Sequence, residues 1–269
     1  IASNDAADYV IVGCNELGIP GKMFYHSVNI VPLQELVSVL SNSTKRQPIH
    51  DRETLFLALE KETEQVLRNG IRWHESFMQE EADITPTPFT SAFMEGCIEN
   101  GCDMLLGMQY PQRVVSQQGT TNLINALAAI DEVVFHQHAV TLDQLAETMQ
   151  KNFQGYEPVR QQLLNAPKWG NDHPQMQEIA DRWMAMRDRI LRKLEYEFQT
   201  PRHLNCHVTR SLNYLQGSRI GASPDGRLAG EPLSDSIGAV TGTAAEGPTA
   251  ILNSVCGMNP TIYWDGGYN

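Results

Sequence analysis

The sequence has 269 residues, of which 41% are apolar, and it carries 20 Lys and Arg against 32 Asp and Glu. A chain of this length can bury a large core and sits near the upper limit for a single domain. The formal net charge of −12 excludes a nucleic-acid-binding protein that works by phosphate neutralisation, because such binding needs a basic face. No apolar run approaches the roughly 18 residues needed to cross a bilayer, so we expect no membrane association.

Cysteine usage indicates a reducing compartment. There are five Cys residues, an odd number, and no basic-then-apolar leader stands at the start, so we expect reduced thiols in a cytoplasmic protein. Cys97 and Cys102 do not have the spacing of a zinc knuckle, and we predict no metal site. The first residue is Ile1, and a strand-like run follows almost at once, which suggests that the sequence begins inside a larger domain.

The first half of the chain is predicted to be mainly helical. The patterns indicate a buried strand over 8–14, a breaker-rich loop over 15–21, and helices over 32–40, 51–81 and 90–99. Gly70 is expected to bend or split the long helix, because glycine is a poor helix former. Asn100-Gly101 is expected to form a left-handed cap.

The second half adds more helices and two further strands. We expect a polar loop over 107–119, helices over 121–135, 141–153 and 174–198, and strands over 204–209 and 250–255. The last of these helices carries a stripe rich in Met and Trp, which we interpret as core packing. Helices with a few apolar, widely separated strands predict an α/β fold with a parallel sheet or barrel.

Two segments read Gly-Cys-x-Glu, at residues 13–16 and 96–99. Cys14 comes at the end of a predicted strand, where α/β enzymes place reactive side chains. Cys97 falls in the last turn of a predicted helix, and we interpret that second match as coincidental. The alternative for Cys14 is a buried thiol at a strand end, with a role in packing alone.

The chemistry of Cys14 depends on Glu16, two residues later. A thiolate nucleophile needs a positive neighbour to lower its pKa, and a carboxylate has the opposite effect. The pair therefore suits a thiol that gives up a hydrogen atom better than one that gives up a proton. A cysteine hydrolase would need a histidine partner, and the histidines are scattered without any hydrolase spacing.

The segment 8–22, DYVIVGCNELGIPGK, resembles the active-site cysteine loop of glycyl radical enzymes, the pyruvate formate-lyase superfamily. A second segment, 221–238, GASPDGRLAGEPLSDSIG, resembles a signature loop of the same family. Segments 119–135, 166–172 and 247–255 also look like family segments, in the right order. The resemblance covers nearly the whole chain.

This resemblance implies that residues 1–269 are one partial domain of a helix-rich, ten-stranded α/β barrel, truncated at both ends. Cys14 would become a thiyl radical and Glu16 would be the general base, with a pKa raised by burial. Asn205 and His207 would contact substrate, although a hydrogen-bonded polar pair in the core is the alternative.

Departures from the family pattern limit the reactions that we expect of this protein. Gly13 stands where pyruvate formate-lyase has a second cysteine, so we expect a dehydratase, another C–O or C–N lyase, or a decarboxylase. The glycine that carries the radical in this family is absent here, so the chain alone is expected to be inactive. The alternative is a non-catalytic homologue or an isolated scaffold fragment.

The resemblance also implies partners and conditions. These are a small-molecule substrate, a radical S-adenosylmethionine activating enzyme, a homodimer, and an anaerobic cytoplasm, because oxygen destroys the radical. We expect no metal or organic cofactor within this chain; the protein-based glycyl radical would reside elsewhere in the complete enzyme.

Overall fold

The computed structural model describes residues 1–12, 16–207, 212–259 and 265–266. Its strands are β1 Val10–Val12, β2 Glu16–Gly18, β3 Met23–Ile30, β4 Tyr110–Gln117, β5 His203–His207 and β6 Asp265–Gly266. Its helices are α1 Ser3–Ala7, α2 Pro32–Ser41, α3 Ser43–Arg46, α4 Arg52–Ile84, α5 Pro88–Ser91, α6 Cys97–Asn100, α7 Met104–Gly107, α8 Thr120–Ile130, the π-helical turn η1 Asp131–His136, α9 Leu142–Gln150, α10 Glu157–Asn165, α11 Pro174–Phe198, α12 Leu212–Gly217 and α13 Gly247–Cys256. Among these described helices, none is long and apolar enough to cross a membrane.

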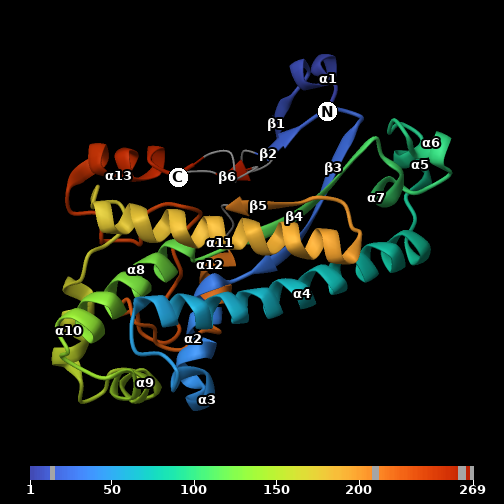
Figure 1. The fold of residues 1–269 in the computed structure, drawn as a ribbon. Helices are drawn as coiled ribbons and strands as arrows, with labels where there is room; N and C mark the ends of the chain where they lie inside the picture. Colours follow the sequence, from blue (N-terminus) through green and yellow to red (C-terminus); the bar gives the residue numbers. More distant parts are fainter. Residues whose placement is uncertain (13–15, 208–211, 260–264, 267–269) are drawn as a thin grey trace.

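Four parallel strands form the central sheet, in the order β3-β4-β5-β6 (Figure 1). The register places Val28 beside Val115, and Val115 beside Asn205. Strands β1 and β2 form a separate antiparallel hairpin that pairs Ile11 with Leu17. Parallel strands joined by helical crossovers are the arrangement expected of part of an α/β barrel.

The two faces of the sheet have different surroundings, because successive side chains of a strand point to opposite faces. Val28, Ile30 and Val115 belong to the main core, together with residues of α2, α4, α8 and α11. Tyr25, Val114 and Cys206 form a separate small cluster on the opposite face. In Figure 1 the long helices α4 and α11 cross the sheet, and the hairpin β1–β2 lies on the side away from α4.

Most of the long helices agree with the sequence patterns. Helix α4 begins with an Asp51 capping box, and it runs through Gly70 unbroken, so the expected split is wrong. A Cβ at Gly70 would lie 3.5 Å from Ile30 Cδ1, an ordinary contact distance, so Gly70 packs against β3 where an alanine would also fit. On α11, Trp183 and Ile190 are buried in the main core, which confirms the interpretation of its apolar stripe.

Four local expectations are wrong. Segment 107–119 is not a polar loop but contains β4, the strand next to β3 at the centre of the sheet. Segment 250–255 lies in helix α13; its short apolar run suits a strand or a helix equally well. The first strand is not buried, since Ile11 is 63% exposed, and residues 16–18 of the expected loop form β2.

Candidate active site

The hairpin β1–β2 carries both residues to which the resemblance gives catalytic roles. Cys14 lies outside the described residues, as does the side chain of Glu16. The backbone of Val12 pairs with that of Glu16, so the two described strands flank residues 13–15 in the sequence. Strand β2 lies beside β6, and β6 in turn pairs with Cys206 and His207 of β5. The hairpin therefore stands against the carboxyl end of the sheet, where α/β enzymes place their reactive groups.

The segment before the hairpin is held to the sheet by buried polar contacts. Tyr110 of β4 donates a hydrogen bond of 2.7 Å from its hydroxyl to the carboxylate of Asp5 in α1. The Lys22 ammonium lies 2.6 Å from the same carboxylate, and the hydrogen bond from Lys22 lowers the pKa of Asp5. Tyr110 shares its face of β4 with Val114, so α1 lies on the face away from the helical core.

Asn205 and His207 lie on the opposite face, toward the helices. They alternate with Cys206, and the register puts them beside Val115 and Gln117. Gln117 donates a hydrogen bond of 3.2 Å to Asn205 Oδ1, and His207 Nδ1 lies 3.4 Å from Thr120 Oγ1. Burial lowers the pKa of His207 to about 3. This placement favours the alternative of a hydrogen-bonded polar pair in the core, and substrate contact by these two residues stays a prediction.

Cys206 of β5 points to the hairpin side, as Leu204 does, and it is completely buried. Its register partner on β4 is Ser116, also completely buried, whose hydroxyl has no hydrogen-bond partner within the described part of the chain. Sequence reasoning missed both residues. Strand alternation could have identified Cys206, since it lies between the two residues that were chosen.

The signature-like loop 221–238 is held at the same end of the sheet by helix α8. Asn122 donates a hydrogen bond of 2.7 Å to the carboxylate of Asp225, and its own carbonyl accepts one of 2.7 Å from the amide of Ser234. Ser236 donates to the carbonyl of His207, at the end of β5, over 3.0 Å. The guanidinium of Arg227 donates to main-chain carbonyls of the loop and of α12. The loop is thus a rigid cover over the ends of β4 and β5.

In the second Gly-Cys-x-Glu segment, residues 96–99, the glycine and the glutamate form the start of helix α6. Cys97 is the first residue of α6 rather than part of a last helical turn, so that expectation is wrong. Gly96 has a φ of 95° and its amide donates to the Glu99 carboxylate over 3.1 Å. Glu99 thus caps the start of its own helix. The predicted left-handed cap at Gly101 is confirmed, with a φ of 62°.

Comparison with known proteins agrees with this architecture. The family model for pyruvate formate lyase-like proteins matches residues 1–211. The chain belongs to the pyruvate formate lyase-like family. The resemblance to glycyl radical enzymes, identified in the sequence, is thereby confirmed.

Relatives in this family catalyse several different reactions. The chain is 27% identical to the indoleacetate decarboxylase of Tractidigestivibacter scatoligenes, over 98% of the chain and 34% of that enzyme. It is also 27% identical to the isethionate sulfite-lyase of Oleidesulfovibrio alaskensis, over 93% of the chain and 32% of that enzyme. The glycerol-bound B12-independent glycerol dehydratase of Clostridium butyricum superposes with a TM-score of 0.87 at 25% identity, over 99% of this chain and 36% of that one. The chain therefore spans about a third of the length of the relatives it matches.

Proposed function

We propose that this chain is the part of a glycyl radical lyase that carries its thiyl-forming cysteine, Cys14, and its general base, Glu16. The observation that supports this most directly is the strand pair β1–β2, which flanks residue 14 in the sequence and of which β2 lies beside β6 at the carboxyl end of the sheet. Membership of the pyruvate formate lyase-like family supplies the chemistry that such a cysteine performs.

The proposed reaction uses two groups of this chain. The Cys14 sulfur radical takes a hydrogen atom from a substrate carbon, which leaves a thiol and a carbon-centred substrate radical. Where a hydroxyl or sulfonate group is lost, the Glu16 carboxylate takes the proton of the hydroxyl on the radical carbon, the leaving group departs with its bonding electron pair, and Glu16 then returns the proton to the leaving group. Where a carboxyl group is lost, the hydrogen atom is taken from its O–H instead, and carbon dioxide departs with one electron of the broken bond left on the substrate carbon. The product radical then takes the hydrogen atom back from the Cys14 thiol, so that no electrons are gained or lost over the cycle.

The substrate class follows from what the relatives are named for. A dehydratase, a decarboxylase and a sulfite-lyase eliminate water, carbon dioxide and sulfite respectively. We propose a small polar substrate in which a hydroxyl, carboxylate or sulfonate group is lost after abstraction of a hydrogen atom, rather than the thiolysis of pyruvate. The face that carries Ser116 and Cys206 is the proposed wall of the substrate cavity.

The complete enzyme would also need components beyond this chain. The radical would be stored on a glycine and installed by a radical S-adenosylmethionine activating enzyme, in an anaerobic cytoplasm. We propose a homodimer, by analogy with the family, and assign no metal or organic cofactor to the reaction itself.

The test uses the complete protein, activated under anaerobic conditions and offered 1,2-diols, hydroxyproline, isethionate and indoleacetate as candidate substrates. We expect wild-type protein and Cys256→Ala to form a glycyl radical and to consume one of these. Cys14→Ala and Glu16→Gln should keep the radical signal in electron paramagnetic resonance and lose turnover. Cys256 is exposed on α13, which makes it the matched control.

Two results would overturn the proposal. Unchanged turnover in Cys14→Ala would remove the assigned residue from the reaction. A wild-type protein that forms no glycyl radical with active activating enzyme would identify a non-catalytic homologue.

A further inference from the structure

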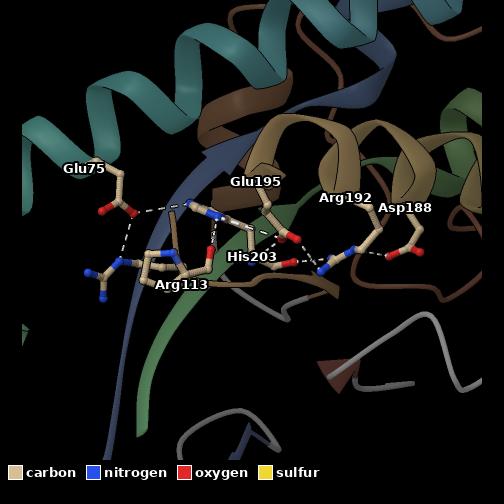
Figure 2. A network of polar contacts seen from close by, with 7 residues as sticks. Glu75, Arg113, Asp188, Arg192, Glu195 and His203 are labelled. Atoms are coloured by element: carbon tan, nitrogen blue, oxygen red, sulfur yellow. Dashed lines mark hydrogen bonds and ion pairs between the residues drawn. The ribbon is translucent and has the colours of Figure 1, made fainter. Parts of the chain in front are cut away.

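A cluster of imidazole and carboxylate groups lies on the helix-covered face of the sheet, at the beginning of β5. His74 and Glu75 come from α4, and His203 is the first residue of β5. One ligand atom of each of these three residues lies within 4.8 Å of the other two. Figure 2 shows Glu75 and His203 facing each other, with Arg113 beside them. His74 and His203 are completely buried.

The contact between His203 and Glu75 lacks a proton or a cation between its two acceptor atoms. His203 Nδ1 lies 3.0 Å from the carbonyl oxygen of Pro201, which can only accept, so Nδ1 carries the hydrogen and Nε2 keeps a lone pair. This Nε2 is buried, has no hydrogen-bond partner among the described residues, and lies 3.5 Å from Glu75 Oε1. In the neutral ring, this lone pair faces the Glu75 carboxylate.

His74 presents a second buried lone pair. Its Nε2 lies 2.8 Å from His26 Nδ1, and His26 Nε2 lies 3.4 Å from the Glu81 carboxylate. In the tautomer of His26 that directs its hydrogen from Nε2 toward Glu81, Nδ1 of His26 accepts from His74 Nε2, and His74 Nδ1 carries no proton. That nitrogen is buried and has no hydrogen-bond partner in the described ranges. Both rings are therefore oriented through their other nitrogen, as metal-bound histidines are.

We propose that His74, Glu75 and His203 bind a divalent transition metal, with Zn²⁺ as the expected ion. Two neutral imidazoles and one carboxylate are the protein ligands of many three-ligand zinc sites, in which the fourth position is open. Glu75 is partly exposed, with 27% of its side chain accessible, which gives an ion a path from solvent. The ion would lie among the three ligand atoms, which are within 4.8 Å of one another.

The charges around the cluster partly oppose and partly favour a cation. Arg113 Nε donates to Glu75 Oε1 over 2.9 Å, and its positive charge counts against binding. Glu81 lies beyond His26, and Glu195 Oε1 lies 4.0 Å from His203 Nδ1. Glu195 is itself paired with Arg192, whose Nη1 lies 2.6 Å from Glu195 Oε2. Of these two carboxylates, Glu81 is therefore the one that offsets the Arg113 guanidinium, and a bound dication would share the Glu75 carboxylate with Arg113.

The ion would link α4 to β5, on the face of the sheet opposite the hairpin that carries Cys14. Its role would be to fix the long helix on the sheet, not to take part in the proposed radical reaction. The metal site is thus independent of the proposed function, and either can fail without the other.

The test measures binding of Co²⁺ and Zn²⁺ to metal-free purified protein, by the visible absorption of tetrahedral Co²⁺ and by calorimetry. We expect one saturable site per chain and a rise in the thermal unfolding temperature with Zn²⁺. Glu75→Gln and His203→Gln should weaken binding at least about tenfold, since even second-shell changes cost 10–100-fold in such sites. His136→Gln is the matched control, because His136 is an exposed histidine on η1 with 62% of its side chain accessible.

Three outcomes would overturn the proposal. They are the absence of saturable binding to wild-type protein, full affinity in Glu75→Gln, and an equal loss in the His136→Gln control. If His203→Gln fails to fold, Glu75→Gln decides the question, because Glu75 is partly exposed and its amide is nearly the same shape.

Discussion

Asn122 of α8 donates a hydrogen bond of 2.7 Å to the carboxylate of Asp225, which is 103 residues away in the chain, and both side chains are buried. The same Asn122 amide accepts from the main-chain amide of Ser234. One side chain thereby fixes both ends of the loop that covers β4 and β5. Ser223 completes the network by donating to Asp225 over 2.6 Å.

Asn122→Ala should therefore destabilise the protein strongly. The substitution leaves a buried carboxylate and a buried amide without one partner each, and each such loss costs about 1–3 kcal/mol. We expect a decrease of about 3 kcal/mol in the free energy of unfolding, measured with urea. Asn253→Ala removes a hydrogen bond of the same length to Asp172 at an exposed position and should cost under about 1 kcal/mol. Equal losses in the two variants would contradict this account of the loop.

Gly96 should be much less tolerant of alanine than Gly101, at the other end of α6. A Cβ at Gly96 would lie 2.7 Å from the carbonyl oxygen of Gly107 and 2.9 Å from the amide of Gln109, whereas a Cβ at Gly101 meets nothing within 4 Å. Both residues have positive φ, so both variants pay the left-handed cost of about 1–2 kcal/mol. We expect Gly96→Ala to cost about 1–3 kcal/mol more than Gly101→Ala in urea unfolding. Equal losses of unfolding free energy in the two variants would contradict this prediction, because they would show that the backbone around Gly96 moves to make room for the Cβ.

The spacing of apolar residues predicted the helices and strands that bury an apolar face. It did not predict strand β4, which buries polar residues. Helices α2, α4 and α11 each bury one apolar stripe, so their sequences indicate them. Strand β4 carries Arg113 and Gln117 on its core-facing side, where Arg113 donates to Glu75 and Gln117 donates to Asn205. Those partners are distant in sequence, and a single strand gives no sign of them.

At the candidate site, too, the sequence indicated what is contiguous in the chain and did not indicate what the fold brings together. The motif around Cys14 identified the segment as a family motif, because its residues are contiguous in the chain, but the strand β2 within the expected loop was not predicted. The choice of Asn205 and His207 depended on which face of β5 is inward, and the apolar pattern of a five-residue strand does not determine this. Cys206 and Ser116 come together only through the parallel register of β4 and β5.

The buried pair of Glu35 and Arg187 should tolerate replacement of both residues better than of one. Arg187 donates to Glu35 over 3.4 Å, and Thr63 donates to the other oxygen over 2.5 Å. Glu35→Leu removes this carboxylate from a buried guanidinium, a loss that typically costs about 3–5 kcal/mol. The double variant Glu35→Leu/Arg187→Met should recover most of it, since apolar replacements of buried ion pairs are often neutral.

The exposed pair of Glu60 and Arg189 supplies the control for that experiment. Glu60→Leu should change the free energy of unfolding by less than about 1 kcal/mol, because surface ion pairs contribute little. The prediction fails if the double variant is as unstable as Glu35→Leu alone, measured by urea unfolding at pH 7.

Acid should destabilise the protein well above the pH at which its carboxylates titrate, and His207 should account for part of this. Burial lowers the pKa of His207 from 6.5 to about 3. Below pH 6.5 the unfolded chain binds a proton at this position that the folded chain does not bind. The contribution of neutral His207 to the free energy of unfolding is therefore fully present above pH 6.5 and decreases as the pH falls toward 3. At pH 5, which is about 1.5 units below the pKa of histidine in the unfolded chain, the loss corresponds to roughly 2 kcal/mol of unfolding free energy. His207→Gln should flatten the dependence of the unfolding free energy on pH between 6.5 and 5 by that amount, and His136→Gln, at an exposed histidine, should leave it unchanged. If the curves of His207→Gln and wild type run parallel over this interval, the folded protein binds a proton at His207 as readily as the unfolded chain does.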